Sequence, residues 1–195
     1  MAPTGRSTEN IVIQDSVNWG DGAGHSIAFM EQSTPYIRNV QLKNIDILHS
    51  YVLAVFFSCC DLFPGEQYNI TLDDVRVEDM KTTEMFEFSG RGNSGHIRDV
   101  NINNFSLLGG NIAPSNISGT DSGSVSNITF NNLKYLGRNI LSASEGQFNI
   151  SGNTSNINFT SSDSVLPTPT PTPSSPRCTN FWDSTLGEQQ NTLPD

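Results

Sequence analysis

The hexapeptide Asn10-Ile-Val-Ile-Gln-Asp15 is the first of six segments of the chain that share one pattern. The pattern is Asn or Asp, then Ile or Val, any residue, then Ile, Leu or Phe, any residue, and a final Asn, Asp or Ser. The first residues of successive segments are separated by 29, 30, 30, 28 and 29 positions. Such near-constant spacing indicates a repeat architecture in which each copy forms one structural unit. The other five copies are residues 39–44, 69–74, 99–104, 127–132 and 156–161.

Each copy predicts a strand with one buried face, because apolar and polar residues alternate along it. In the first copy, Ile11 and Ile13 point to one side of the strand and Gln14 points to the other. The sixth position holds Asp, Asn or Ser, which are turn residues that hydrogen-bond to nearby backbone groups and, for Asp and Asn, tolerate a left-handed backbone. We therefore expect a polar corner after each strand, where side chains of successive copies stack into a hydrogen-bonded ladder.

Two further apolar strips accompany most copies. A short strand follows directly, and another strip begins about 17 residues after the start of the copy. Three strips per repeat, joined by polar turns, predict a three-faced coil, and about six stacked coils predict an all-β, right-handed parallel β-helix. The alternative is an antiparallel sandwich, but it needs hairpin turns between sequential strands and does not explain the constant period. The third strip is clearest at residues 27–29, 56–58 and 86–88.

The composition argues against several kinds of partner. The chain has 20 acidic and 10 basic residues, a net charge of −10, so nucleic-acid phosphates and anionic membrane surfaces would repel it. Its apolar runs are shorter than a membrane-spanning helix. The spacing of Cys and His matches no zinc site, so we expect no metal and no cofactor. We also expect the chain to be a monomer.

The repeat fades after Phe159, where the composition changes. Alternating Pro blocks both a helix and a central strand and favours an extended linker, and the final residues are too few to bury a core. Nothing before the first strand caps the core, so we expect the β-helix domain to be incomplete. The expected parts are β-helix coils over residues 1–164, a Pro/Thr linker over residues 165–176, and a disordered tail or remnant of a further module over residues 177–195.

Seven Asn-X-Ser/Thr sequons favour a secreted protein, because this triplet accepts N-linked glycans. A chain rich in Asn, Ser and Thr also produces such triplets by chance, so both explanations stand at this point. The Pro/Thr linker is typical of an O-glycosylated extracellular segment. The sequons begin at Asn69, Asn104, Asn116, Asn127, Asn149, Asn153 and Asn158.

Gly24-His25-Ser26, followed by the strand Asn39-Val-Gln-Leu42, resembles a motif of the pectin-lyase-like β-helix glycoside hydrolases. In the polygalacturonase members, a Gly-His-Gly motif opens a strand on the cleft face, and an Asn-Val-x-Ile/Leu strand follows it. Ser26 replaces the second glycine here. The resemblance, which extends to the dextranase-like members, covers about residues 10–159. It implies a right-handed parallel β-helix that hydrolyses a polysaccharide.

Other motifs of that family are missing. Its members carry an Asn-Thr-Asp segment and an Asp-Asp pair before the histidine, and an Arg-Ile-Lys segment after it. Here an Ala-Val-Phe segment stands where the basic segment would fall. Asp73 and Asp74 follow His25 instead of preceding it, so the resemblance gives them no catalytic role. We expect the acidic pair typical of the family to lie largely upstream of this chain.

Glycoside hydrolysis usually needs two carboxyl groups that flank the scissile bond. His25 lies 15 positions after Asn10, and Glu84 lies 15 positions after Asn69. Stacked coils would therefore place His25 and Glu84 on one face, two strands and about 10 Å apart. An aromatic ring nearby would pack against the apolar face of a sugar. The catalytic candidates are His25, Asp21 and Glu84, and the substrate-binding candidates are Trp19, Glu31 and Glu87.

Each candidate also has a purely structural interpretation. Glu84 and Glu87 fit solvated positions on an outer face, His25 fits a turn, and Trp19 fits a cover for the end of the core. The first functional hypothesis is the C-terminal part of a secreted glycoside hydrolase that acts on a polysaccharide or oligosaccharide. The alternatives are a non-catalytic extracellular carbohydrate-binding solenoid and a truncated gene product without independent activity.

Overall fold

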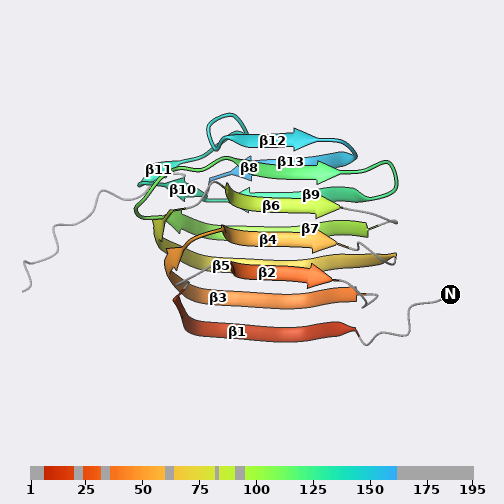
Figure 1. Ribbon diagram of the computed structural model, residues 1–195, viewed down its shortest axis with the longest axis horizontal. Coiled ribbons are helices and arrows are strands. Elements are labelled where there is room, and N and C mark those ends of the chain that lie inside the picture. The colour runs from red at the N-terminus through yellow and green to blue at the C-terminus, as the bar shows by residue number, and fades with distance from the viewer. Residues whose placement is uncertain are drawn as a thin grey trace, which may run out of the picture. The chain divides into compact units, whose positions relative to one another are not determined.

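The computed structural model describes residues 7–19, 24–31, 36–59, 64–81, 84–90 and 95–161. These residues contain no helix, and their parallel strands stack into a solenoid (Figure 1). The all-β parallel β-helix predicted from the repeat is confirmed. The predicted linker and tail, residues 165–176 and 177–195, lie outside the described residues.

The larger sheet stacks one strand from each of the six repeats. Neighbouring strands are parallel in the order β1, β3, β5, β7, β9 and β13. Each of the first four of these strands joins two predicted strands into one long bent strand. Its pairing with the neighbouring strand continues after the polar corner. The strands of this sheet are β1 (Thr8–Trp19), β3 (Tyr36–Ser50), β5 (Gly65–Met80), β7 (Gly95–Leu107), β9 (Ser124–Asn131), β13 (Thr154–Thr160) and the small hairpin β10 (Lys134–Tyr135) and β11 (Arg138–Asn139).

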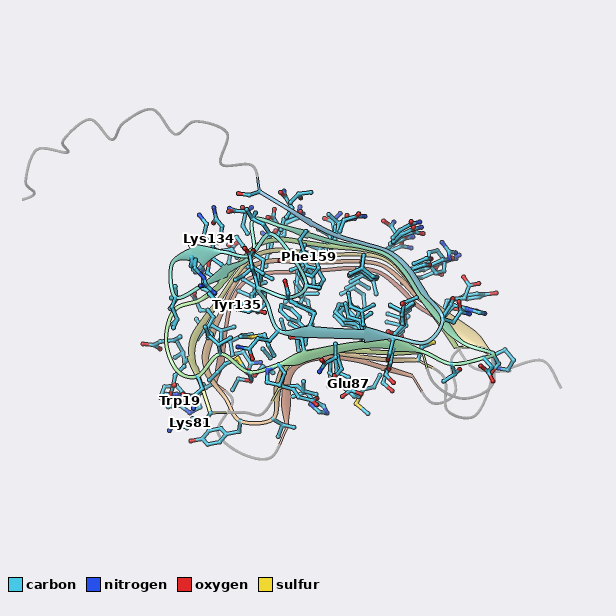
Figure 2. All side chains as sticks on the ribbon, turned by 90° about the horizontal axis from the view of Figure 1, so that it is seen from above. Trp19, Lys81, Glu87, Lys134, Tyr135 and Phe159 are labelled. Atoms are coloured by element: carbon cyan, nitrogen blue, oxygen red, sulfur yellow. The ribbon has the colours of Figure 1, made fainter. Side chains whose placement is uncertain are left out.

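The smaller sheet is built from the third apolar strip of each repeat. Its strands are also parallel, in the order β2, β4, β6, β8 and β12. The view along the stack shows the two sheets facing each other across the core (Figure 2). Each coil therefore contributes to two sheets, instead of three separate faces. The strands of the smaller sheet are β2 (His25–Glu31), β4 (Leu53–Cys59), β6 (Glu84–Gly90), β8 (Ser115–Gly119) and β12 (Phe148–Ser151).

The core consists of columns of equivalent residues, because the register is constant from coil to coil. In the smaller sheet, the Phe57 ring stacks between Phe29 and Phe88, with ring centroids 4.5 and 4.6 Å apart. Buried Cys59 ends the same strand as Phe57 and is disulfide-bonded. The two main columns of the larger sheet are Ile11, Val40, Ile70, Val100, Ile128 and Ile157, and Ile13, Leu42, Leu72, Ile102, Phe130 and Phe159.

Two polar ladders run along the outside of the larger sheet. The one predicted at the sixth position is confirmed at its start, where Asn44 Nδ2 donates to Asp15 Oδ1 at 2.7 Å. The structure adds a second ladder at the first position, where Asn39 Nδ2 donates to Asn10 Oδ1 at 2.9 Å. Both positions have φ between 52° and 60° wherever Asn or Asp occupies them. Asn and Asp are the residues other than Gly that adopt this conformation most readily.

Two features are absent from the described residues. Over these ranges the chain has no helix of the length and hydropathy needed to cross a membrane. In the same part of the chain, no three His, Cys, Asp or Glu side chains gather closely enough to hold a metal ion.

Asn39 offers a direct test of the ladder, because its amide donates to Asn10 and accepts from Asn69 at 2.7 Å. We expect Asn39→Ala to destabilise the fold by about 2–4 kcal/mol, from a left-handed backbone that disfavours a Cβ and from two lost hydrogen bonds of about 1 kcal/mol each. Asn39→Gly removes the backbone cost but also loses the hydrogen bonds, so its stability should lie between those of the parent and of Asn39→Ala. Urea unfolding measures all three, and an Ala variant as stable as the parent would contradict this account.

Candidate functional site

The outer face of the smaller sheet carries the two glutamates predicted for the site. On β6, Phe86 and Phe88 point into the core and are fully buried, so Glu87 between them points outward. Figure 2 shows Glu87 on the outside of this sheet, away from the core. The register places Asn116 of β8 beside Glu87. Glu84 opens the same strand and is partly buried.

Glu84 and Glu87 have different electrostatic environments. Burial raises the pKa of the Glu84 carboxyl above its ordinary value, and the charge of nearby Glu87 raises that pKa further. Asn116 Nδ2 donates to Glu84 Oε1 at 2.7 Å and opposes part of this effect. The arrangement therefore favours a proton on Glu84 while Glu87 provides the neighbouring charge.

His25 lies in the same row of the sheet as Glu84. His25 pairs with Leu53, and Leu53 pairs with Glu84, so the two site candidates are two strands, or about 10 Å, apart along the stack. The His25 ring packs against Phe56 with a centroid distance of 4.3 Å. Its Nδ1 atom is buried and has no hydrogen-bond partner among the described residues. The ring is thus held at one end of the row that leads to Glu84.

Two of the other candidates are not placed by the structure. Asp21 lies outside the described residues. Glu31 ends β2, but its side chain is outside the described part of the chain.

Trp19 lies at a corner of the solenoid, away from the glutamate pair (Figure 2). Trp19 is 61% exposed, and its ring packs edge-to-face with the His49 ring at a centroid distance of 4.9 Å. His49 Nδ1 is 3.5 Å from Asp79 Oδ2, and the Lys81 ammonium lies 5.4 Å from the centroid of Tyr51. We call Trp19, His49, Tyr51, Asp79 and Lys81 the corner cluster. It joins an exposed aromatic face to hydrogen-bonding and charged groups.

Four members of the corner cluster, and Asn116 beside the glutamates, were missed at the sequence level. The repeat period could have predicted several of them, because residues one repeat apart lie side by side in the sheet. Trp19, His49 and Asp79 are 30 positions apart and pair directly in the sheet. Asn116 follows Glu87 by 29 positions. His49 and Asp79 thus lie one and two repeats after Trp19, and Asn116 lies one repeat after Glu87.

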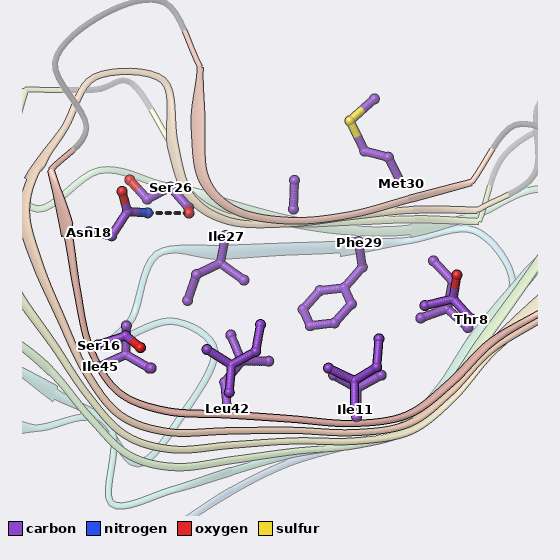
Figure 3. A pocket seen from close by; sticks show the side chains of 14 residues that line it. Thr8, Ile11, Ser16, Asn18, Ser26, Ile27, Phe29, Met30, Leu42 and Ile45 are labelled. Carbon is purple, nitrogen blue, oxygen red and sulfur yellow. Dashed lines mark hydrogen bonds between the residues drawn. The ribbon is translucent and has the colours of Figure 1, made fainter.

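A cavity of about 470 Å³ opens at the N-terminal end of the core, between β1, β2 and β3 (Figure 3). The side chains of Ile27 and Phe29 face Ile11 and Leu42 across it. Among the described residues, its lining contains no charged side chain and does not include Trp19, His25, Glu84 or Glu87. Its described lining is thus mainly apolar, and the pair Glu84 and Glu87 lies elsewhere.

Comparisons with known proteins assign no family to the chain. No family model matches it, and no curated protein or solved structure is significantly similar to it.

The raised pKa of Glu84 can be measured by NMR titration of the carboxyl carbons. Protonated Glu84 is favoured in the folded state, so its contribution to stability is present below the unfolded pKa and is lost as pH rises through the folded pKa. Glu84→Gln should therefore raise stability at neutral pH, and the gain should vanish in acid. Glu87→Gln should lower the pKa of Glu84. An ordinary titration of Glu84 in the parent protein would contradict the assignment.

Proposed function

We propose that this chain is a polysaccharide-acting glycoside hydrolase, and that the outer face of its smaller sheet binds the saccharide. Glu84 is the proton donor to the leaving oxygen, and Glu87 is the carboxylate partner. The observation that carries the proposal is the neighbouring pair Glu84 and Glu87, in which Asn116 Nδ2 donates to Glu84 Oε1 at 2.7 Å, and burial and the charge of Glu87 raise the pKa of Glu84. Glycosidases assign acid and base roles to two carboxyl groups whose environments separate their pKa values.

The surroundings of the pair support a role in saccharide binding. Asn116 donates one Nδ2 hydrogen to Glu84 and accepts from Asn149 Nδ2 at its Oδ1, so its second Nδ2 hydrogen is the group that would donate to a sugar hydroxyl. Asn149 extends the same row on the next strand. Parallel stacking produces a long surface of such rows. An extended polymer suits this surface better than a small molecule, so the proposed substrate is a polysaccharide or a long oligosaccharide.

The resemblance at Gly24-His25-Ser26 supports the same class of enzyme, namely the polygalacturonase and dextranase-like hydrolases. Besides the missing motifs, the proposal differs from the family pattern in the place of its carboxyl pair, which lies within this chain and downstream of His25. The sequons and the Pro/Thr segment support a secreted protein. Its proposed environment is therefore extracellular, where polymeric saccharides are available.

A second candidate function is saccharide binding without catalysis. The corner cluster favours it, because the exposed Trp19 ring offers a stacking face and Lys81 and Asp79 offer hydrogen bonds beside it. No member of the glutamate pair is needed for binding at this position. The two functions thus depend on different residues and can be separated by mutation.

Release of reducing ends from a panel of pectins, dextrans and other glucans tests the proposal. We expect turnover by the parent chain, and a loss of about 10²- to 10⁴-fold in Glu84→Gln, because general acid catalysis contributes that much. Activity should fall as pH rises through the pKa of Glu84, since the acid form is then lost. Asp79→Asn, in the corner cluster, is the matched control and should retain activity.

The same panel, measured as binding by calorimetry, identifies the second candidate. Binding without turnover that Trp19→Ala abolishes and Glu84→Gln leaves unchanged would replace the hydrolase proposal by the binding one. Turnover unaffected by Glu84→Gln would contradict the role given to that carboxyl.

A further inference from the structure

The seven sequons differ in how the fold uses their asparagine side chains. Six of the seven side-chain amides donate hydrogen bonds within the solenoid. Asn69 donates to Asn39, Asn104 to Asp73, Asn127 to Asp99, Asn116 to Glu84, Asn149 to Asn116, and Asn158 to the backbone oxygen of Asn156, at distances from 2.7 to 3.3 Å.

Asn153 is the exception. Its side chain is exposed, and none of the hydrogen bonds among the described residues involves it. Its backbone is nevertheless fixed, because its carbonyl oxygen accepts a hydrogen bond from Val125 N at 3.1 Å. It occupies the turn between β12 and β13, directly after Gly152 with φ of 67°. A glycan on this exposed amide would therefore break none of the side-chain hydrogen bonds of the described solenoid.

Exposure alone does not separate Asn153 from the other sequons, since Asn69, Asn104 and Asn127 are also exposed. These three differ from Asn153 because they are members of the hydrogen-bonded ladders. Asn127 Nδ2 donates to Asp99 and its Oδ1 accepts from Asn156 at 2.9 Å, so it has a neighbour on both sides along the stack. Strands in a sheet are about 4.8 Å apart. A bulky sugar on Nδ2 at such a position competes with the neighbouring ladder side chains and with the hydrogen bond of that nitrogen.

We propose that Asn153 is the N-glycosylation site of this chain, and that the six hydrogen-bonded asparagines are reserved for the fold. In the transfer, Asn153 Nδ2 loses one proton and forms a bond to the anomeric carbon of an oligosaccharide. The bond from that carbon to a lipid diphosphate donor breaks, and the diphosphate leaves with the electron pair. Ser155, which is also exposed, supplies the hydroxyl that completes the sequon.

The test is site mapping on the full chain, secreted from a eukaryotic host behind a cleavable leader. Enzymatic removal of N-glycans in ¹⁸O water converts each glycosylated Asn into labelled Asp, which peptide mass spectrometry locates. We expect Asn153 to be labelled in most of the secreted protein and the six hydrogen-bonded sequons to be largely unlabelled. Secreted, cooperatively folding protein in which any of those six sequons is mostly occupied, or in which Asn153 is unmodified, would overturn the proposal.

Two variants sharpen the result. Ser155→Ala keeps Asn153 but removes its sequon, so it should abolish the glycan mass with an unchanged unfolding midpoint. Asn158→Gln removes the sequon with the weakest hydrogen bond and should leave the glycan mass unchanged. Because the leader is supplied, the outcome is independent of the protein's natural location and of any hydrolase activity, and either proposal can fail alone.

Discussion

The fixed register between successive coils is the constraint on which this structure depends. Parallel pairing holds each repeat directly above the one before it, so a residue type at one position of the repeat becomes a column. Apolar columns make the core, and Asn columns make ladders outside it. A shift of one residue would turn every apolar column outward. Near-constant spacing of 28 to 30 residues is what keeps the columns aligned.

The ladders offset the backbone cost of bending the strands around the core. The strands must bend around the core, and the bend needs a left-handed backbone that disfavours most residues. Asn accepts that conformation, and its amide then offsets the cost by bonding to the next coil, as Asn39 does on both sides. Asn thus both adopts the left-handed backbone of the bend and links successive coils by hydrogen bonds. The same use of the amide nitrogen distinguishes the ladder asparagines from Asn153.

The same register brings together candidate site residues that are far apart in sequence. It brings Asn116 to Glu84, aligns His25 with Glu84 through Leu53, and joins Trp19 to His49 and Asp79. These groupings occur on outer faces and corners, where the core does not dictate the residue type. Partial burial then separates Glu84 from an ordinary surface glutamate by favouring its neutral form.

The sequence by itself determined the solenoid, because alternation and period are local properties that can be read along the chain. It also gave the row shared by His25 and Glu84, which follows from equal offsets within the repeat. Only the tertiary structure decided that two predicted strands merge into one bent strand, and that each coil feeds two sheets. It alone decided the environment of Glu84, the corner cluster around Trp19, and which asparagine amides remain free. Those properties depend on burial and on side-chain partners one coil away, which a linear pattern does not specify.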